Sequence, residues 1–231
     1  MRSIAYFLSH LRLPLVHLRL SRKVIAVLLM LLTTVTLSLE LNQKLLNFID
    51  DRFGSAAVKR LKQWEQLANS DKTIPTLTKL KLVNDFFNQA EFISDIKHWG
   101  REDYWATPVE LLATNGGDCE DYSIAKYFTL KELGLPVEQL KITYVKALKL
   151  NQAHMVLSYY PTPNAEPLIL DNLIDNIKPA SQRKDLVPVY SFNGEGLWLA
   201  KFRGKKGKRI SGPDKLDNWL DLMNRQSKLL N

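Results

Sequence analysis

The sequence is poor in the residues that most often carry chemistry. It contains one cysteine, Cys119, and four histidines in 231 residues. A single cysteine forms neither an internal disulfide nor a cysteine-based zinc cage, so a disulfide scaffold and a zinc finger are excluded. The chain also lacks the motifs HExxH, GxSxG and GxxxxGK(S/T), which are typical of zinc peptidases, serine hydrolases and nucleotide-binding loops.

Acidic residues are missing from the first 39 positions, which contain five arginines and lysines. Residues 24–39 are uncharged and mostly apolar, and Arg22 and Lys23 stand directly before them. A positive flank followed by a short apolar run is typical of a secretory signal. As a helix this run spans roughly 24 Å, less than the roughly 30 Å of a bilayer core, and an uncleaved anchor in the inner membrane is the alternative. Both interpretations of residues 1–39 predict that residues 40–231 lie outside the cytoplasm.

The formal net charge of +8 does not indicate nucleic-acid binding. Residues 1–39 contribute +5, and residues 198–231, with nine basic and three acidic residues, contribute +6. The body between them therefore has a net charge of −3. A mildly acidic body with basic ends does not make a polybasic groove. We interpret residues 40–200 as one globular domain and residues 201–231 as a basic C-terminal tail.

Apolar spacing predicts helices in the first half of this domain and strands in the second. The predicted helical segments are 41–67 with a break at Gly54, 76–88, a short stretch after Ser94, a brief helix from Thr107, and 118–133. The predicted strands are 140–145, 154–160, 167–171, 187–191 and 196–201. Helices followed by antiparallel strands predict an α+β fold.

Cys119 lies at the predicted start of a helix, directly after a glycine turn. The partial positive charge of a helix N-terminus stabilises a thiolate, and glycines let a substrate backbone approach the sulfur. A lone cysteine is, however, more often a small buried hydrophobe than a nucleophile. Two histidines beyond the first 39 residues could serve as its base, His98 and His154. His98 is the weaker candidate, because it stands at a helix end with no opposed carboxylate.

His154 and Asp171 lie on two predicted strands that a short turn connects. If the turn is centred between Thr162 and Pro163, His154 lies directly opposite Asp171, with Cβ atoms roughly 5 Å apart. The carboxylate would orient the imidazole, and the other ring nitrogen would face Cys119 as a base. A His–Asp pair inside a β core is the alternative, and a register shift of one residue would undo the pairing.

Several blocks of the sequence resemble the bacterial transglutaminase-like cysteine proteinases, in particular the LapG-type periplasmic proteases. The blocks are DYWATPVE at 103–110, GGDCEDY at 116–122, HMVL at 154–157, LDNL at 170–173 and YSFN at 190–193. The resemblance implies a papain- and transglutaminase-like fold with N-terminal helices packed on an antiparallel sheet. It also implies Cys119 as the nucleophile, His154 as the base and Asp171 as the orienting acid.

The same resemblance implies a calcium ion, with Asp118, Glu120 and Asp121 in the ligand positions of the family. Three carboxylates within four residues repel one another, and a hard cation with several oxygen ligands relieves this repulsion. The alternative is that these acids only favour the positive end of the helix.

The resemblance further implies two partners for a periplasmic protease. One is a giant surface adhesin, cut near its N-terminus at a paired-alanine site so that the adhesin is released and the biofilm disperses. The other is a LapD-type inner-membrane cyclic-di-GMP receptor that sequesters the protease. Two alternatives stay open for the sequence: an acyl transferase with the same three residues, and a non-catalytic periplasmic module that binds partners through calcium.

Overall fold

The computed structural model describes residues 38–199, 208–212 and 216–230. The segment interpreted as a signal or an anchor lies, up to residue 37, outside the described residues, as does most of the basic run after residue 200. The described residues belong to one unit, which begins at Ser38. None of the helices in the described ranges is long and apolar enough to cross a membrane.

The first half of this unit is helical, as predicted. Its helices are α2 (Gln43–Phe53), α3 (Ser55–Ala68), α4 (Thr76–Phe87), α5 (Asp95–His98), α6 (Pro108–Thr114) and α7 (Cys119–Glu132). Gly54 separates α2 from α3 with φ at +80°, a conformation that glycine adopts without strain. Thr107 caps α6 in a capping box with Glu110, as the sequence pattern of this segment predicts.

The second half forms an antiparallel sheet of seven strands in the order β6-β5-β4-β3-β7-β8-β9. The strands are β3 (Leu140–Ala147), β4 (Gln152–Tyr159), β5 (Leu168–Leu170), β6 (Lys178–Pro179), β7 (Leu186–Asn193), β8 (Gly196–Leu199) and β9 (Lys208–Ser211). A separate parallel pair joins β1 (Glu91–Phe92) to β2 (Gly116–Gly117). The α+β prediction is therefore confirmed. The sequence missed β1, β2 and β6, which have two residues each and are too short to show a period of two, and β9, which lies in the segment interpreted as a basic tail.

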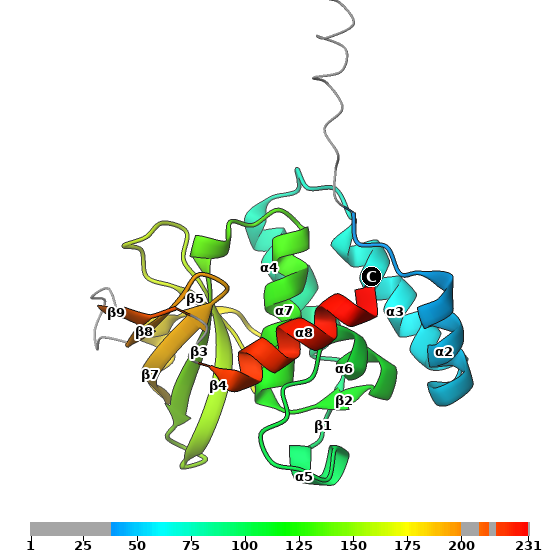
Figure 1. The fold of residues 1–231 in the computed structure, drawn as a ribbon. Coiled ribbons are helices and arrows are strands. Elements are labelled where there is room, and N and C mark those ends of the chain that lie inside the picture. Colours follow the sequence, from blue (N-terminus) through cyan, green and yellow to red (C-terminus); the bar gives the residue numbers. More distant parts are fainter. Residues whose placement is uncertain (1–37, 200–207, 213–215, 231) are drawn as a thin grey trace, which may run out of the picture. The chain divides into compact units, whose positions relative to one another are not determined.

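Helix α7 is the centre of the domain and contacts α3, α4, α6, β3 and β4. Figure 1 shows it between the sheet and the other helices. Its buried apolar side chains point in several directions and include Ile124, Ala125, Tyr127 and Leu130. A helix that is buried on most sides cannot shift without disturbing every layer around it. The residues at its start are therefore held at a fixed position against β4.

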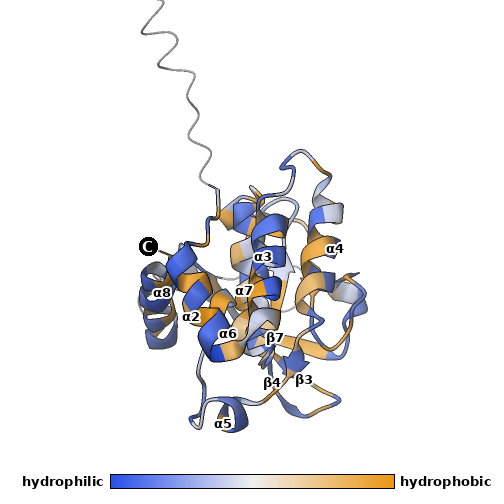
Figure 2. Ribbon diagram, turned by 90° about the vertical axis from the view of Figure 1, so that its right-hand side faces the viewer, coloured by the Kyte–Doolittle hydropathy of each residue, from blue (hydrophilic) through white to orange (hydrophobic). Residues whose placement is uncertain are grey.

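The C-terminal part contains a further helix, α8 (Asp217–Leu230), which the interpretation of residues 201–231 as a tail did not anticipate. Its Trp219 is buried and stacks on Phe128 of α7, with ring centroids 5.8 Å apart. Leu222 is also fully buried. Figure 2 shows that the outward face of α8 is mainly hydrophilic. This helix is therefore an amphipathic layer of the domain, and it packs on α7.

The β4–β5 hairpin has a different register from the predicted one. Ser158 pairs with Ile169, whereas the predicted turn placed it opposite Pro167. The shift is two residues, so each side chain keeps its face of the sheet. His154 and Asp171 consequently lie on one face as diagonal neighbours, which long side chains can bridge.

Leu222→Ala should lower the free energy of unfolding by about 2–4 kcal/mol, because it leaves a cavity between α8 and α7. Leu220→Ala in the same helix removes a side chain that is 43% exposed, and we expect a loss below about 1 kcal/mol. Urea unfolding of the two variants measures the difference. Equal effects of the two substitutions would contradict the packing of α8 on the domain.

Candidate active site

Cys119 is the first residue of α7, and the turn before it is built by glycine. Asn115 ends α6 in the left-handed conformation, and Gly116 and Gly117 then pair with β1. A Cβ on Gly117 would lie 2.5 Å from Oδ2 of Asp121, and one on Gly116 would lie 2.5 Å from Cδ1 of Ile93. The packing of the protein itself therefore disfavours a side chain at both positions, most strongly at Gly117, where Cβ of Asp121 also lies within 2.9 Å. The predicted approach of a substrate backbone stays a prediction.

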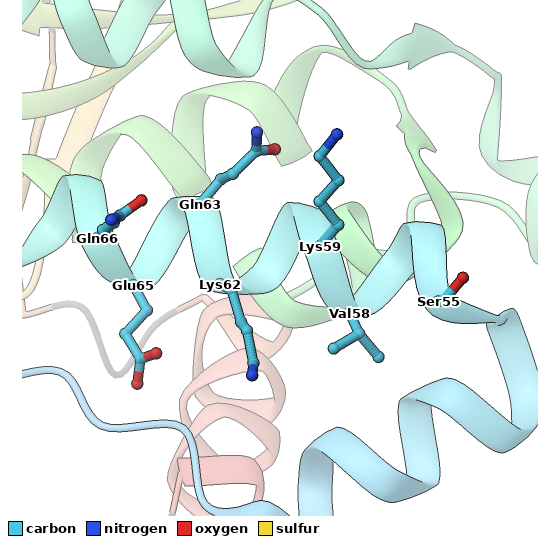
Figure 3. Close-up of a pocket in the computed structure, with 7 residues that line it drawn as sticks. All are labelled: Ser55, Val58, Lys59, Lys62, Gln63, Glu65 and Gln66. Carbon is cyan, nitrogen blue, oxygen red and sulfur yellow. The ribbon is translucent and has the colours of Figure 1, made fainter.

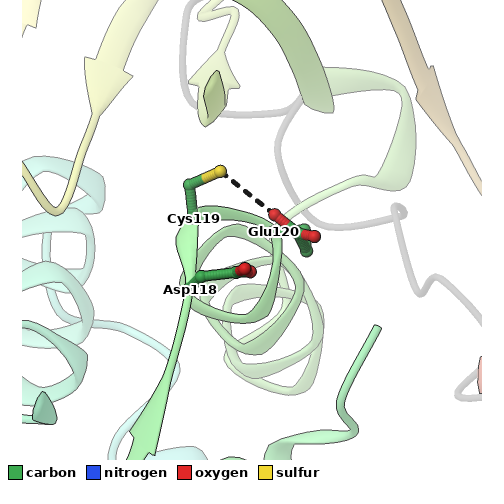
Figure 4. A group of neighbouring side chains, drawn as sticks. All are labelled: Asp118, Cys119 and Glu120. Atoms are coloured by element: carbon green, nitrogen blue, oxygen red, sulfur yellow. Dashed lines mark hydrogen bonds between the residues drawn. The ribbon is translucent and has the colours of Figure 1, made fainter. Parts of the chain in front are cut away.

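The thiol of Cys119 donates a hydrogen bond to Oε2 of Glu120, at 3.0 Å (Figure 4). Burial and then the neighbouring carboxylate of Glu120 raise the pKa of Cys119 well above its ordinary value. The backbone N–H of Met155 acts in the opposite direction but is the smaller effect. Burial and the acidic neighbours therefore act against a thiolate at Cys119, opposite to the effect that the sequence predicts for the helix N-terminus.

Four carboxyl groups crowd around the start of α7. The carboxylates of Asp95, Asp118 and Asp121 have oxygen atoms that all lie within 4.8 Å of one another, and Glu120 adjoins them through Asp118. Burial and like charge raise the pKa of Asp95 to about 6 and that of Asp118 to about 8. The pKa values of Glu120 and Asp121 are also raised, in both cases first by burial. The sequence predicted three of these acids and missed Asp95, which comes from α5.

Backbone N–H groups donate hydrogen bonds to some of these carboxylate oxygens. Tyr104 donates to Oδ2 of Asp95 at 2.5 Å, Ala106 donates to Oδ1 of Asp121 at 2.7 Å, and Asp118 donates to Oδ2 of Asp121 at 3.1 Å. The remaining oxygens Oδ1 of Asp95 and Oδ1 of Asp118 are buried without a hydrogen-bond partner. Buried carboxylate oxygens that lack a donor fit a hard cation, which takes oxygen ligands only.

His154 and Asp171 form a buried pair on the sheet. Nε2 of His154 lies 2.8 Å from Oδ1 of Asp171, and both residues are almost fully buried. Burial favours the neutral acid, but the hydrogen bond and the charge of His154 outweigh it and lower the pKa of Asp171 to about 2. Because the carboxylate is ionised and can only accept, Nε2 donates to it. Nδ1 is then the ring nitrogen that faces away from the acid.

Arg183 is a third member of this group that the sequence did not reveal. Its Nη2 donates to Oδ2 of Asp171 at 2.7 Å, and its Nε and Nη2 donate to the carboxylate of Asp185. Oδ1 of Asp171 also accepts the N–H of Leu173 at 3.0 Å. Both carboxylate oxygens of Asp171 thus accept hydrogen bonds, and these bonds fix the plane of the carboxylate relative to His154. No local sequence signal distinguishes Arg183 from a surface arginine.

The structure brings the three predicted catalytic residues to neighbouring elements, but it joins only two of them by a hydrogen bond. Cys119 stands against β4, where its sulfur meets the N–H of Met155, the residue after His154. Within the described ranges no hydrogen bond links the thiol to the His154 ring, because the thiol donates to Glu120. The ring of His98, the weaker candidate, packs at a tilt of 51° against that of Trp99, with centroids 4.4 Å apart, and burial lowers the pKa of His98.

A shallow surface pocket lies elsewhere, along α3. Figure 3 shows the seven residues that line it, all from this helix: Ser55, Val58, Lys59, Lys62, Gln63, Glu65 and Gln66. None of them is a predicted site residue. The predicted site residues Cys119 and His154 lie instead at the junction of α7 and β4.

The family model of the bacterial transglutaminase-like cysteine proteinases matches residues 54–198. The chain belongs to this family. It is 48% identical to EGTA-treated LapG from Legionella pneumophila, with a TM-score of 0.69, over 79% of this chain and 96% of that one. Calcium-bound LapG from the same organism is 47% identical, with a TM-score of 0.68, over 80% and 98% of the two chains. No curated protein matches the chain. The predicted family and fold are confirmed, and the chain is a cysteine protease.

The ionised Asp171 makes stability depend on pH. Its pKa of about 2 in the folded state lies below the ordinary value of roughly 3.9, so its contribution is present above pH 4 and is lost as the pH falls toward 2. Between roughly pH 5 and pH 3 this one group should account for about 1 kcal/mol of lost stability.

Asp171→Asn should therefore show a flatter decline of unfolding free energy in this pH range than the wild type, although its absolute stability is lower. Urea unfolding at a series of pH values measures this slope. Asp85→Asn on the exposed side of α4 is the matched control and should keep the wild-type slope. A wild-type slope in Asp171→Asn would contradict the buried ion pair.

Proposed function

We propose that this protein is a calcium-dependent periplasmic endopeptidase that uses Cys119, His154 and Asp171 as its catalytic residues. The observation that carries the proposal is the buried hydrogen bond of 2.8 Å between His154 and Asp171. The next residue after His154 is Met155, and its backbone N–H interacts with the sulfur of Cys119. Membership of the cysteine proteinase family supports the assignment of Cys119, since it is the only cysteine of the chain.

In this mechanism Nδ1 of His154 takes the proton of the Cys119 thiol, and the sulfur attacks the carbonyl carbon of the peptide bond. The imidazolium then gives its proton to the leaving amine, and the acyl group stays on the sulfur as a thioester. A water molecule, deprotonated by the same nitrogen, hydrolyses the thioester. Asp171 keeps the tautomer and stabilises the imidazolium. The reaction requires the thiol to turn from Glu120 toward His154.

Calcium would be held by Asp118, Glu120 and Asp121, the residues that the family resemblance implies, together with Asp95, whose unpartnered oxygen adjoins them. When bound, the ion supplies positive charge that offsets the crowded carboxylates beside the thiol. The protein's own residues fit this role, because two buried acid oxygens lack any hydrogen-bond donor. That LapG from Legionella pneumophila has both calcium-bound and EGTA-treated structures supports the proposal.

The proposed substrate is a giant surface adhesin, cut near its N-terminus at a paired-alanine site so that biofilm cells are released. A LapD-type cyclic-di-GMP receptor of the inner membrane is the proposed sequestering partner. Both proposals are supported by the similarity to LapG over most of the chain. The apolar segment before residue 40, cleaved or retained as an anchor, would place the enzyme in the periplasm with these partners.

Cys119→Ala should abolish cleavage of a peptide with two consecutive alanines, because no other residue of the chain offers a thiol. We expect a loss of kcat/KM of at least about a thousandfold with an unchanged thermal unfolding midpoint. Mass spectrometry of the products, with a labelled amine present, separates hydrolysis from acyl transfer. Cleavage by a correctly folded Cys119→Ala variant would contradict the assignment, and incorporation of the amine in place of water would favour the transferase alternative.

Asp95→Asn should weaken calcium binding by about tenfold or more, since it removes an oxygen charge from the cluster. Calorimetric titration with calcium measures the affinity directly, and the rise of the unfolding midpoint with calcium gives a second readout. Asp103→Asn changes a nearby acid outside the cluster and is the matched control. Equal calcium affinity in wild type and Asp95→Asn would remove Asp95 from the site.

A further inference from the structure

Lys126 is a charged residue in the middle of the core. It lies on α7, two turns after Cys119, and it is 1% exposed. A buried ammonium group is costly unless polar partners surround it. Its Nζ donates to Oδ1 of Asn88 at 2.7 Å and stands 5.8 Å from the centre of the Tyr122 ring. The proposed mechanism does not use this lysine, and its burial therefore requires another explanation.

Asn88 also contacts the segment that contains Asp171, and it therefore connects Lys126 to this segment. Its Nδ2 donates to the backbone oxygen of Asp171 at 2.9 Å and to Oδ1 of Asp175 at 2.8 Å. The side-chain oxygen of Asn88 accepts from Lys126, and the NH₂ group faces two acceptors of the Asp171 segment. These contacts together select one orientation of the amide of Asn88, and Lys126 supplies the donor on its oxygen side.

The segment from Asp171 to Asp175 has little else to hold its main chain. It follows β5 and forms no helix or strand of its own. Asn84, one turn before Asn88 on the same face of α4, donates to the backbone oxygen of Asp175 at 2.9 Å. Two asparagine side chains at a spacing of four residues therefore hold both ends of the segment against α4.

We propose that Lys126 and Asn88 are positioning residues for Asp171, acting through the backbone of the Asp171–Asp175 segment. This inference rests on the proposed function, because it assigns a role to the support of the proposed catalytic acid. Arg183 and His154 fix the carboxylate, whereas Asn88 fixes the main chain from which it extends. Loss of the Asn88 donors would move Asp171 away from Nε2 of His154, and a small displacement of this kind lowers turnover more than substrate binding.

Asn88→Asp tests the donors alone. The new carboxylate still accepts from Lys126, but it cannot donate to Asp171 or to Asp175. We expect kcat on a fluorogenic peptide with two consecutive alanines to fall about tenfold or more, with KM within about twofold. The double variant Asn88→Asp with Asp175→Asn exchanges donor and acceptor, so that residues 88 and 175 can pair again. Because residue 88 still cannot donate to the backbone oxygen of Asp171, the double variant should recover only the part of kcat that depends on the 88–175 pair, and full recovery would contradict the role of the Asp171 contact.

Two further variants complete the set. Lys126→Met replaces the buried amine by an apolar chain of similar length and leaves Oδ1 of Asn88 without its donor, while both acceptors of Nδ2 remain. It should lower kcat in the same direction and serves if Asn88→Asp does not fold. Lys81→Met, on the exposed side of α4, is the matched control and should keep wild-type kcat. Wild-type kcat in folded Asn88→Asp and Lys126→Met would overturn the proposal.

A proton NMR measurement separates this inference from the proposed function. The Nε2–H of His154, bonded to an ionised carboxylate in a buried site, should give a slowly exchanging downfield signal in the full chain. We expect this signal to shift or vanish in Asn88→Asp, to stay displaced in the double variant and to be unchanged in Lys81→Met. If the wild type gives the signal but cleaves no peptide, the proposed function fails while the NMR series still decides the positioning role. An unchanged signal in Asn88→Asp would refute that role.

Discussion

Crowding of buried negative charge at the start of α7 is the constraint on which the rest of the site depends. Asp95, Asp118, Glu120 and Asp121 meet there beside the only thiol of the chain. Buried carboxylates cannot all be ionised without a compensating positive charge. In the structure their pKa values rise, and the thiol of Cys119 donates to Glu120. Acids packed against the sulfur in this way disfavour its thiolate, and the proposed calcium ion would offset their charge.

The His154–Asp171 pair of the site is built independently of the acidic cluster at the start of α7. His154 and Asp171 belong to the sheet, and their hydrogen bond is already formed. Arg183 holds the carboxylate, and α4 holds the main chain below it. The proposed base and its orienting acid are thus held by hydrogen bonds, whereas the proposed nucleophile has a side-chain rotation still to make. Activation in this account is a local change at Cys119, and it requires no rearrangement of the domain.

Much of the fold could be predicted because the signals are local. The helices up to α7 show apolar spacing and recognisable ends, such as the capping box at Thr107. His154 and Asp171 could be placed on one face because side chains in strands alternate with a period of two. The predicted register was wrong by two residues, and a shift of two leaves every side chain on its face. The register itself depends on how many residues the turn takes up, and the sequence of the turn did not reveal this. Asp95 and Arg183 reach the site from distant segments, so no local pattern could reveal them.

Helix α8 is different, because its signal was present in the sequence. Trp219, Leu222 and Gln226, its buried residues, follow the spacing of a helix face. The basic run before them led to the interpretation of a tail. The side chains of α8 reach back to the site, since Arg225 donates to the backbone oxygen of Trp105 at 2.5 Å. Trp105 precedes Ala106, whose N–H binds Asp121.

The rate at which iodoacetamide alkylates Cys119 tests the central claim most directly, because only the thiolate reacts. The account predicts fast alkylation near neutral pH in the presence of calcium. It predicts a rate lower by about tenfold or more in EGTA, and a similar loss in His154→Ala with calcium present. One slow rate under all three conditions, or equal rates with and without calcium, would contradict the coupling between the acids, the thiol and the imidazole.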